Sequence, residues 1–224
     1  MSIEPPIQPL LPILGGGRFP VGRIFCVARN YAEHAREMGD VSAEPPFFFI
    51  KPSTCLPTVP GRLPYPPMSE DVHHEVELVV ALGLGGADIA PADALRHVFG
   101  YAVGLDMTRR DLQAEAKEKR RPWDMGKVFD GAAPVSVIVP AAEAEGLDDA
   151  EIQLTIDGEV RQQGRTSDMI WSPAEIIAEL SRYIRLNPGD LIFTGTPAGV
   201  GPVVRGNRLE ARVGLLPSLE VEIV

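Results

Sequence analysis

Cysteine and long apolar runs are scarce in this chain. Two cysteines, Cys26 and Cys55, occur in 224 residues, too few for a disulfide framework, and this predicts the reduced environment of the cytoplasm. No run approaches the roughly twenty apolar residues of a membrane-spanning helix. The first twelve residues are rich in proline and lack the basic start and apolar stretch of a signal peptide. We therefore expect a cytoplasmic protein that does not enter a membrane.

Positive charge is also in short supply. Lysine and arginine number 21 against 31 acidic residues, so the net charge is −10. This balance argues against nucleic acid and anionic membrane surfaces as partners. The basic run at residues 117–121 is interpreted as a solvated helix face. The G-x-S-x-G and H-E-x-x-H motifs are absent, and glycine-rich residues 83–86 and 199–201 lack dinucleotide spacing, so serine esterase, zincin and dinucleotide-binding readings are disfavoured.

Strand patterns punctuated by turn residues dominate the chain, which predicts a mostly β fold with a few helices. Residues 1–22 are predicted to be a proline-rich N-terminal arm and residues 23–224 one catalytic domain. A hairpin turn is expected at Asp157-Gly158. One helix should start at the capping box of Ser172, Pro173 and Glu175 and end at 187–189, and another should run over 108–121. Strands are predicted at 24–28, 47–50, 75–82, 101–105, 135–139, 152–156, 191–194, 209–213 and 219–224.

Three carboxylates in an apolar context form a candidate metal site. On a strand, Glu75 and Glu77 share one face, where two like charges repel unless a cation lies between them. Asp106 ends another apolar run and could supply a third oxygen. Such a ligand set suits a hard ion, Mg²⁺ or Mn²⁺. The alternative is a half-exposed strand with solvated glutamates. His73 shares the glutamate face and is expected to serve packing or to support a ligand.

A histidine and a glutamate three residues apart, His34 and Glu37, lie in a segment that is typical of a short helix. They share a helix face, so Glu37 can orient the imidazole while its other nitrogen faces a water. This is the arrangement of a general base and its orienting carboxylate. On an exposed helix the same spacing is more often a surface ion pair.

Five ordered motifs closely resemble the fumarylacetoacetate hydrolase family, in its short acylpyruvate hydrolase and oxaloacetate decarboxylase branch. They are residues 26–34, Phe49-Ile50-Lys51-Pro52, His74 to Leu78, Leu105-Asp106-Met107-Thr108, and Thr194 to Gly201. The resemblance implies a mixed β-sandwich roll, a homodimer, and a metal held by Glu75, Glu77 and Asp106. It also implies that His34 and Glu37 lie on a lid helix as the catalytic pair.

An anionic substrate requires local positive groups, and the chain offers Arg29, Lys51, Arg110 and Lys127 near these motifs. The resemblance implies substrate contacts for Arg110 and Gln113, and a catalytic Lys127 close to the ion. Thr196 is expected to offer its hydroxyl or amide to the substrate carboxylate. Arg29 is a further candidate for substrate binding.

The parts together predict a metal-dependent hydrolase that cleaves acylpyruvates to pyruvate and a carboxylic acid. Among these substrates the resemblance favours 3-fumarylpyruvate. Two other activities stay open on the same site: oxaloacetate decarboxylation, and isomerisation or hydration of dienoates. A non-catalytic metal-binding protein is the alternative from another class, and it would have no need for His34 and Glu37.

Overall fold

The computed structural model describes residues 8–33 and 45–224. In that part of the chain, a six-stranded sheet has the order β10-β8-β7-β13-β3-β4 and a five-stranded sheet the order β12-β11-β15-β16-β5. The first comprises β3 (Arg23–Ala28), β4 (Phe47–Pro52), β7 (Val76–Leu82), β8 (Val98–Leu105), β10 (Val139–Pro140) and β13 (Leu191–Phe193). The second comprises β5 (Arg62–Leu63), β11 (Glu151–Ile156), β12 (Glu159–Arg165), β15 (Arg208–Val213) and β16 (Leu219–Ile223).

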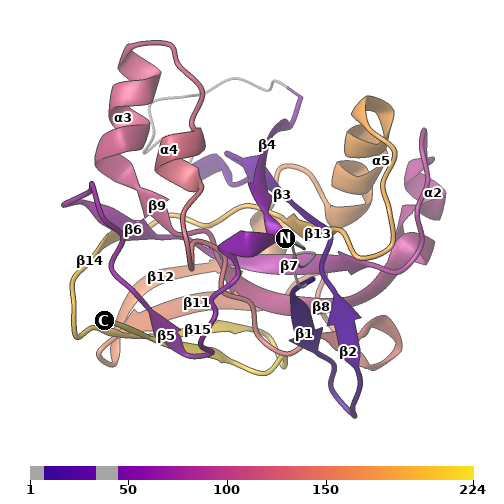
Figure 1. Cartoon of the computed structure of the whole chain (residues 1–224). Helices are drawn as coiled ribbons and strands as arrows, with labels where there is room; N and C mark the ends of the chain where they lie inside the picture. The colour runs from indigo at the N-terminus through magenta and orange to yellow at the C-terminus, as the bar shows by residue number, and fades with distance from the viewer. Residues whose placement is uncertain (1–7, 34–44) are drawn as a thin grey trace, which may run out of the picture.

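Smaller elements flank these sheets (Figure 1). A three-stranded sheet contains β14 (Gly201–Val203), β6 (Val72–His74) and β9 (Thr108–Arg109), and a hairpin contains β1 (Leu10–Pro12) and β2 (Arg18–Pro20). The α-helices of the described residues are α2 (Pro91–Ala94), α3 (Arg110–Glu118), α4 (Asp124–Lys127) and α5 (Pro173–Tyr183). Short 3₁₀ turns are η1 (Ser53–Cys55), η2 (Leu95–His97), η3 (Ala141–Glu143) and η4 (Thr166–Asp168). This composition confirms the predicted mostly β fold with a few helices.

Both faces of the six-stranded sheet are covered, so its central strand β7 is buried at all seven positions. On one face, Leu78 of β7 shares a core with Leu154 of the five-stranded sheet. Further along the same face, Leu82 packs with Ile177 of α5. On the other face, Val79 and Ala81 pack with the β1–β2 hairpin through Leu11 and Phe19. Burial on both faces explains the nearly continuous apolar sequence of this strand.

The described N-terminal residues pack on this core through the β1–β2 hairpin. Leu11, Phe19 and Val21 are buried with Ile24 and Cys26 of β3. The β1–β2 pairing is antiparallel, with Leu11 opposite Phe19. The part of the proline-rich segment that the structure describes is therefore a hairpin packed on the sheet.

Local signals in the sequence account for several elements. Asp157 and Gly158 both have positive φ, 53° and 85°, as the predicted two-residue turn between β11 and β12 requires. The Ser172–Glu175 capping box begins α5 as expected, but the helix ends at Tyr183, before residues 187–189.

A predicted helix and a predicted strand are shorter in the structure. The helix expected over 108–121 starts only at Arg110, because Thr108 and Arg109 pair with β6. The strand expected at 135–139 is reduced to β10 and two isolated bridges, Val135 with Gly104 and Ile138 with Ile13.

The sheet topology gathers several strand ends at one edge. β7 and β8 are antiparallel, so the start of β7 lies beside the end of β8. β13 is antiparallel to β7 and parallel to β3, so both also end at this edge. The residues that follow β3, β8 and β13, together with those that precede β7, therefore converge on one place.

Candidate metal centre and substrate cleft

Glu75, Glu77 and Asp106 meet at this edge. Each offers a carboxylate oxygen, and the three oxygens lie within 4.8 Å of one another. Val76 pairs with Leu105 in the antiparallel register, which places Glu75 opposite Asp106. All three residues are buried, with exposures of 5%, 2% and 1%, so the alternative of solvated glutamates on a half-exposed strand is wrong.

The strand predicted at 75–82 begins one residue later, at Val76. β6 ends at His74 and β7 begins at Val76, and the two strands belong to different sheets. Glu75 thus lies where the chain passes from one sheet to the other. This break leaves its carboxylate beside that of Glu77 while its backbone carbonyl accepts from the Asp106 amide at 2.9 Å.

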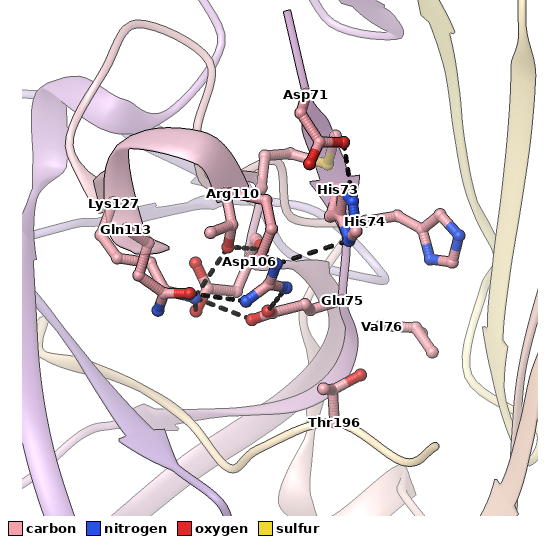
Figure 2. A network of polar contacts seen from close by, with 12 residues as sticks. Asp71, His73, His74, Glu75, Val76, Asp106, Arg110, Gln113, Lys127 and Thr196 are labelled. Atoms are coloured by element: carbon pink, nitrogen blue, oxygen red, sulfur yellow. Dashed lines mark hydrogen bonds and ion pairs between the residues drawn. The ribbon is translucent and has the colours of Figure 1, made fainter. Parts of the chain in front are cut away.

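Among the described residues, three cations contact the acidic triad. Lys127 Nζ donates to Glu75 Oε2 and Asp106 Oδ2, both at 2.8 Å, and to Thr108 Oγ1 at 2.7 Å. Arg110 donates to Glu75 Oε1 (Figure 2). Lys51 Nζ lies 2.9 Å from Asp106 Oδ1, at ion-pair distance but outside hydrogen-bond geometry. The three positive charges match the three negative charges.

Lys127 donates all three of its ammonium protons to these acceptors. Burial alone would lower its pKa, but the charges of Asp106 and Glu75 outweigh burial and raise the pKa above the ordinary value. Lys127 is therefore a permanent cation whose charge acts on the carboxylates. It would have to give up one of its partners to donate to a substrate.

Lys51 lies outside the cleft and has a structural role. Its side chain is fully buried, and Nζ donates to the carbonyl oxygens of Met107 and Ala132 at 3.0 Å and to that of Lys127. These bonds connect β4 to the residues after β8, to the end of α4 and to residue 132. The expectation that Lys51 provides a positive group near the motifs is met, but only through Asp106.

The donor set fits a hard divalent cation. Burial, followed by the neighbouring charges of Asp106 and Glu75, raises the pKa of Glu77 well above its ordinary value. The charged form of Glu77 is thus disfavoured in this site, and a cation bound beside it would stabilise that form. All-oxygen ligands without thiolate or imidazole suit Mg²⁺ or Mn²⁺.

The Thr-Gly-Thr-Pro turn after β13 supports Glu77. The backbone amide of Gly195 donates to Glu77 Oε2 at 2.6 Å. Gly195 has φ +98°, and a Cβ added there would lie 2.7 Å from Asn30 Cβ. The Asn30 side chain in turn donates to the Thr194 carbonyl at 2.7 Å. Only glycine fits this position without moving the donor to Glu77.

Gln162 of β12 organises the other side of the site and was not predicted. Its Oε1 accepts from the Val76 amide at 3.1 Å and lies 2.8 Å from His74 Nδ1. Its Nε2 donates to Thr196 Oγ1 at 2.8 Å. Burial lowers the pKa of His74 to about 4, so this ring is neutral and its Nδ1 carries the proton. Thr196 accepts from Gln162 and retains its own hydroxyl proton for another acceptor.

A cleft of about 380 Å³, counting solvent at its mouth, opens from the acidic triad. It brings together the predicted substrate-binding residues Arg29, Arg110, Gln113 and Thr196 with Lys127. Gln113 Oε1 accepts from Arg110 Nη1 at 2.6 Å. Among the described residues none accepts from Gln113 Nε2, so this amide can donate to a ligand. The hydrophobic lining is provided by Val27, Ala28, Phe49 and Trp123.

Two further predictions concern basic and histidine residues. Lys117 lines the cleft, so the interpretation of residues 117–121 as a wholly solvated face is wrong for this residue. His73 does not join the acidic triad: its ring contacts Asp71 Oδ1 at 2.9 Å and accepts from Arg110 Nε at 3.4 Å (Figure 2). It supports Arg110, which in turn contacts Glu75. His34 and Glu37 lie outside the described residues.

Comparison with known proteins identifies the family. The model for "Fumarylacetoacetate (FAA) hydrolase C-terminal" matches residues 23–224, and the chain belongs to this family. Its fold is accordingly of the type that the sequence motifs implied.

The relatives carry more than one activity name. A crystal structure of fumarylpyruvate hydrolase from Pseudomonas aeruginosa in complex with Mn²⁺ and pyruvate has a TM-score of 0.95 and 48% identity, covering 100% of this chain and 99% of that chain. The mitochondrial oxaloacetate tautomerase of Mus musculus is 42% identical over 200 residues, 89% of this chain and 90% of the relative. The mitochondrial oxaloacetate decarboxylase of Dictyostelium discoideum is 40% identical over 204 residues, 90% and 94% respectively. In the described residues, no helix is long and apolar enough to cross a membrane.

Proposed function

We propose that this chain is a metal-dependent hydrolase that cleaves the C3–C4 bond of acylpyruvates, with 3-fumarylpyruvate as the favoured substrate. The observation that carries the proposal is the buried triad of Glu75, Glu77 and Asp106 at the floor of a cleft lined by cations. The similarity to a fumarylpyruvate hydrolase whose crystals contain Mn²⁺ and pyruvate supports the same conclusion. The products are pyruvate and the carboxylic acid of the acyl group.

The residues around the triad suit the 2-oxo acid end of such a substrate. Mg²⁺ or Mn²⁺, held by Glu75, Glu77 and Asp106, would supply a Lewis acid there. Thr196 offers a hydroxyl proton and Gln113 an amide proton to the carboxylate. Arg110 and Lys127 offset the charge of the triad, so it does not repel an anionic substrate.

The reaction needs a water and a base. We propose that His34 takes a proton from water, which adds to C4, and that Glu37 supports the resulting imidazolium. Breakage of the C3–C4 bond leaves its electron pair on C3, which takes up a proton and becomes the methyl group of pyruvate. The hydroxyl group stays on C4 as part of the new carboxylic acid. The charge of Lys127 acts through its carboxylate partners.

Oxaloacetate is the second candidate substrate. The tautomerase and decarboxylase names of relatives at 40–42% identity favour it. Oxaloacetate has the same 2-oxo acid end and would use the same donors in the cleft. Its tautomerisation moves a proton at C3, and its decarboxylation breaks the C3–C4 bond and releases C4 as carbon dioxide. Neither reaction needs a nucleophilic water.

Steady-state assays with a panel of substrates test the proposal. Purified protein saturated with Mg²⁺ or Mn²⁺ would be given acetylpyruvate, 3-fumarylpyruvate and oxaloacetate, and release of pyruvate and of the acyl acid would be measured, with enol–keto exchange of oxaloacetate followed separately. We expect the highest kcat/KM for 3-fumarylpyruvate. Turnover of oxaloacetate alone would replace the hydrolase proposal with the second candidate, and turnover of none would leave a non-catalytic metal-binding protein.

We also propose that the protein is a homodimer formed through its β-rich body. The described edge strand β4 exposes Phe47 and Ile50, which are 52% and 49% accessible. Such an edge favours pairing with another chain unless it is covered. Sedimentation at micromolar concentration checks this, and a monomer there would contradict it.

A further inference from the structure

Helix α3 presents three polar side chains to the cleft at helical spacing. Arg110, Gln113 and Lys117 occupy positions i, i+3 and i+7, and all three line the cleft. Residues at this spacing lie along one face of a helix. Lys119, two residues on, is exposed and pairs with Glu115 at the helix surface. The basic run therefore contains one lysine that belongs to the cleft.

Lys117 differs from the inner cations in its partners. Arg110 and Lys127 already contact carboxylates of the triad. Among the described residues no carboxylate forms an ion pair with Lys117, whose Nζ lies 5.1 Å from the centroid of the Trp123 ring. Lys117 lies four residues beyond Gln113, which is about 6 Å along the helix axis. It is also less buried than Gln113, so it lies further from the floor of the cleft.

The surroundings of Lys117 disfavour its charged form, which a bound anion would stabilise. Burial has the largest effect on the pKa of Lys117, followed by the charges of Arg110, Arg29 and Lys127. Together they lower this pKa to about 8, and the charge of Glu75 opposes them with a smaller effect. These groups come from α3 itself, the end of β3, α4 and the β6–β7 junction. A bound carboxylate would reverse this imbalance.

We propose that Lys117 binds a second carboxylate, at the far end of a 2-oxo acid whose first carboxylate lies at the triad. This assignment rests on the proposed function for the placement of the 2-oxo acid end. It makes the preferred ligand class a dicarboxylate. The inner charges support it, because among the described residues Lys51, Arg110 and Lys127 already pair with carboxylates of the triad. The positive charge of Lys117 is then left for a distal anionic group, while Trp123 packs beside the carbon chain.

Binding of two matched, unreactive ligands tests the assignment without relying on turnover. The ligands are 2-oxoadipate and 2-oxohexanoate, which differ by a terminal carboxylate in place of a methyl group. Each would be titrated calorimetrically into Mn²⁺-saturated wild type, Lys117→Met, Lys117→Arg and Lys119→Met. The wild type should prefer 2-oxoadipate by about tenfold, the usual worth of a hydrogen bond to a charged group. Lys117→Met should lose this preference, and Lys119→Met should keep it.

A wild type without the preference, or a Lys117→Met protein that retains it, would overturn the assignment and leave Lys117 as a partner of Trp123 only. Failure of the wild type to bind either ligand would overturn it as well. A Mn²⁺ titration of each variant checks that the metal centre is assembled. If Lys117 sets the preference but no acylpyruvate is hydrolysed, the proposed function fails and the assignment stands. If acylpyruvates are hydrolysed but Lys117→Met keeps the preference for 2-oxoadipate, the assignment fails and the proposed function stands.

The pH dependence of binding provides a second readout. Only the charged ammonium binds a carboxylate, so the affinity for 2-oxoadipate should fall as the pH rises through about 8, whereas that for 2-oxohexanoate should not show this additional fall. Lys117→Arg should keep part of the preference and remove the fall, because a guanidinium stays charged in this range. A parallel pH profile for the two ligands in the wild type would contradict the assignment.

Discussion

The backbone amide of Asp106 donates to the carbonyl oxygen of Glu75 at 2.9 Å. Two of the three candidate metal ligands are therefore joined by main-chain pairing, where the start of β7 lies beside the end of β8. The third, Glu77, lies on β7 two residues after Glu75 and accepts from the Gly195 amide. Because main-chain bonds hold these positions, the carboxylates remain close despite their mutual repulsion.

Replacing Glu75 by glutamine should weaken metal binding by roughly 100-fold or more, since the affinity of an all-oxygen site follows its ligand charge. The change removes one of three carboxylates while Lys51, Arg110 and Lys127 remain, so the site becomes net positive before the ion arrives. Calorimetric titration with Mn²⁺ measures the loss. Glu220→Gln, which changes an exposed residue of β16, is the matched control. Normal activity of Glu75→Gln after chelator treatment, without added metal, would show that the site is wrongly assigned.

Replacing Lys127 by methionine should destabilise the metal-free protein by about 3–5 kcal/mol, the usual cost of removing one partner from a buried ion pair. Saturating Mn²⁺ should restore more of the free energy of unfolding in this variant than it adds to the wild type, because the ion replaces part of the missing positive charge. Urea unfolding with EDTA or with Mn²⁺ measures both quantities, with Lys119→Met as control. An equal loss under both conditions would mean that Lys127 contributes packing alone.

Replacing Gly195 by alanine should both destabilise the protein and weaken the metal. The new Cβ meets Asn30 Cβ at 2.7 Å and must displace the amide that donates to Glu77. Gly206→Ala is a matched control, because Gly206 has a similar φ of +91° and no atom within 4 Å of its added Cβ. We expect about 1 kcal/mol for the control and a larger loss for Gly195→Ala, with reduced Mn²⁺ affinity only in the latter. Equal effects on both measurements would show that backbone strain, not the contact with Asn30, governs this turn.

Much of the site could be predicted because its signals are local. Strand periodicity predicted that Glu75 and Glu77 lie side by side, and the Ser172 capping box marks a helix start that depends only on neighbouring residues. The position of Asp106 opposite Glu75 required the β7–β8 register, which the sequence alone does not specify. The family motifs supplied the expectation that these carboxylates meet.

The remaining features arise from tertiary contacts. Gln162 lies on a strand with mostly exposed neighbours, and no spacing pattern indicates that its amide joins His74 to Thr196. Lys117 belongs to a basic run of the kind that usually faces solvent, and only the placement of α3 separates it from Lys119. Strand β6, which directly precedes Glu75, was not predicted, and it forms by pairing with β9 and β14, two segments distant in sequence. Local propensity does not report such pairings.

The catalytic pair proposed from the sequence leads to the last prediction. If His34 activates the attacking water, His34→Ala should lower acylpyruvate hydrolysis by roughly 10²–10⁴-fold, the usual worth of a positioned general base. Substrate binding at the triad should survive. Any decarboxylation of oxaloacetate needs no nucleophilic water, so it should fall less in the same variant. Glu37→Gln should change both rates in the same direction, because the imidazolium loses its supporting charge.

The measurement is the ratio of the two rate losses, taken in matched preparations saturated with Mn²⁺. Glu220→Gln serves as the control for handling and metal content, since it lies on an exposed position of β16. Equal losses for the two substrates would mean that His34 contributes to both reactions alike, and so does not act by activating water. Unchanged hydrolysis in His34→Ala would remove the pair from the mechanism and leave the metal centre of Glu75, Glu77 and Asp106, with the cations that contact it, as the catalytic apparatus.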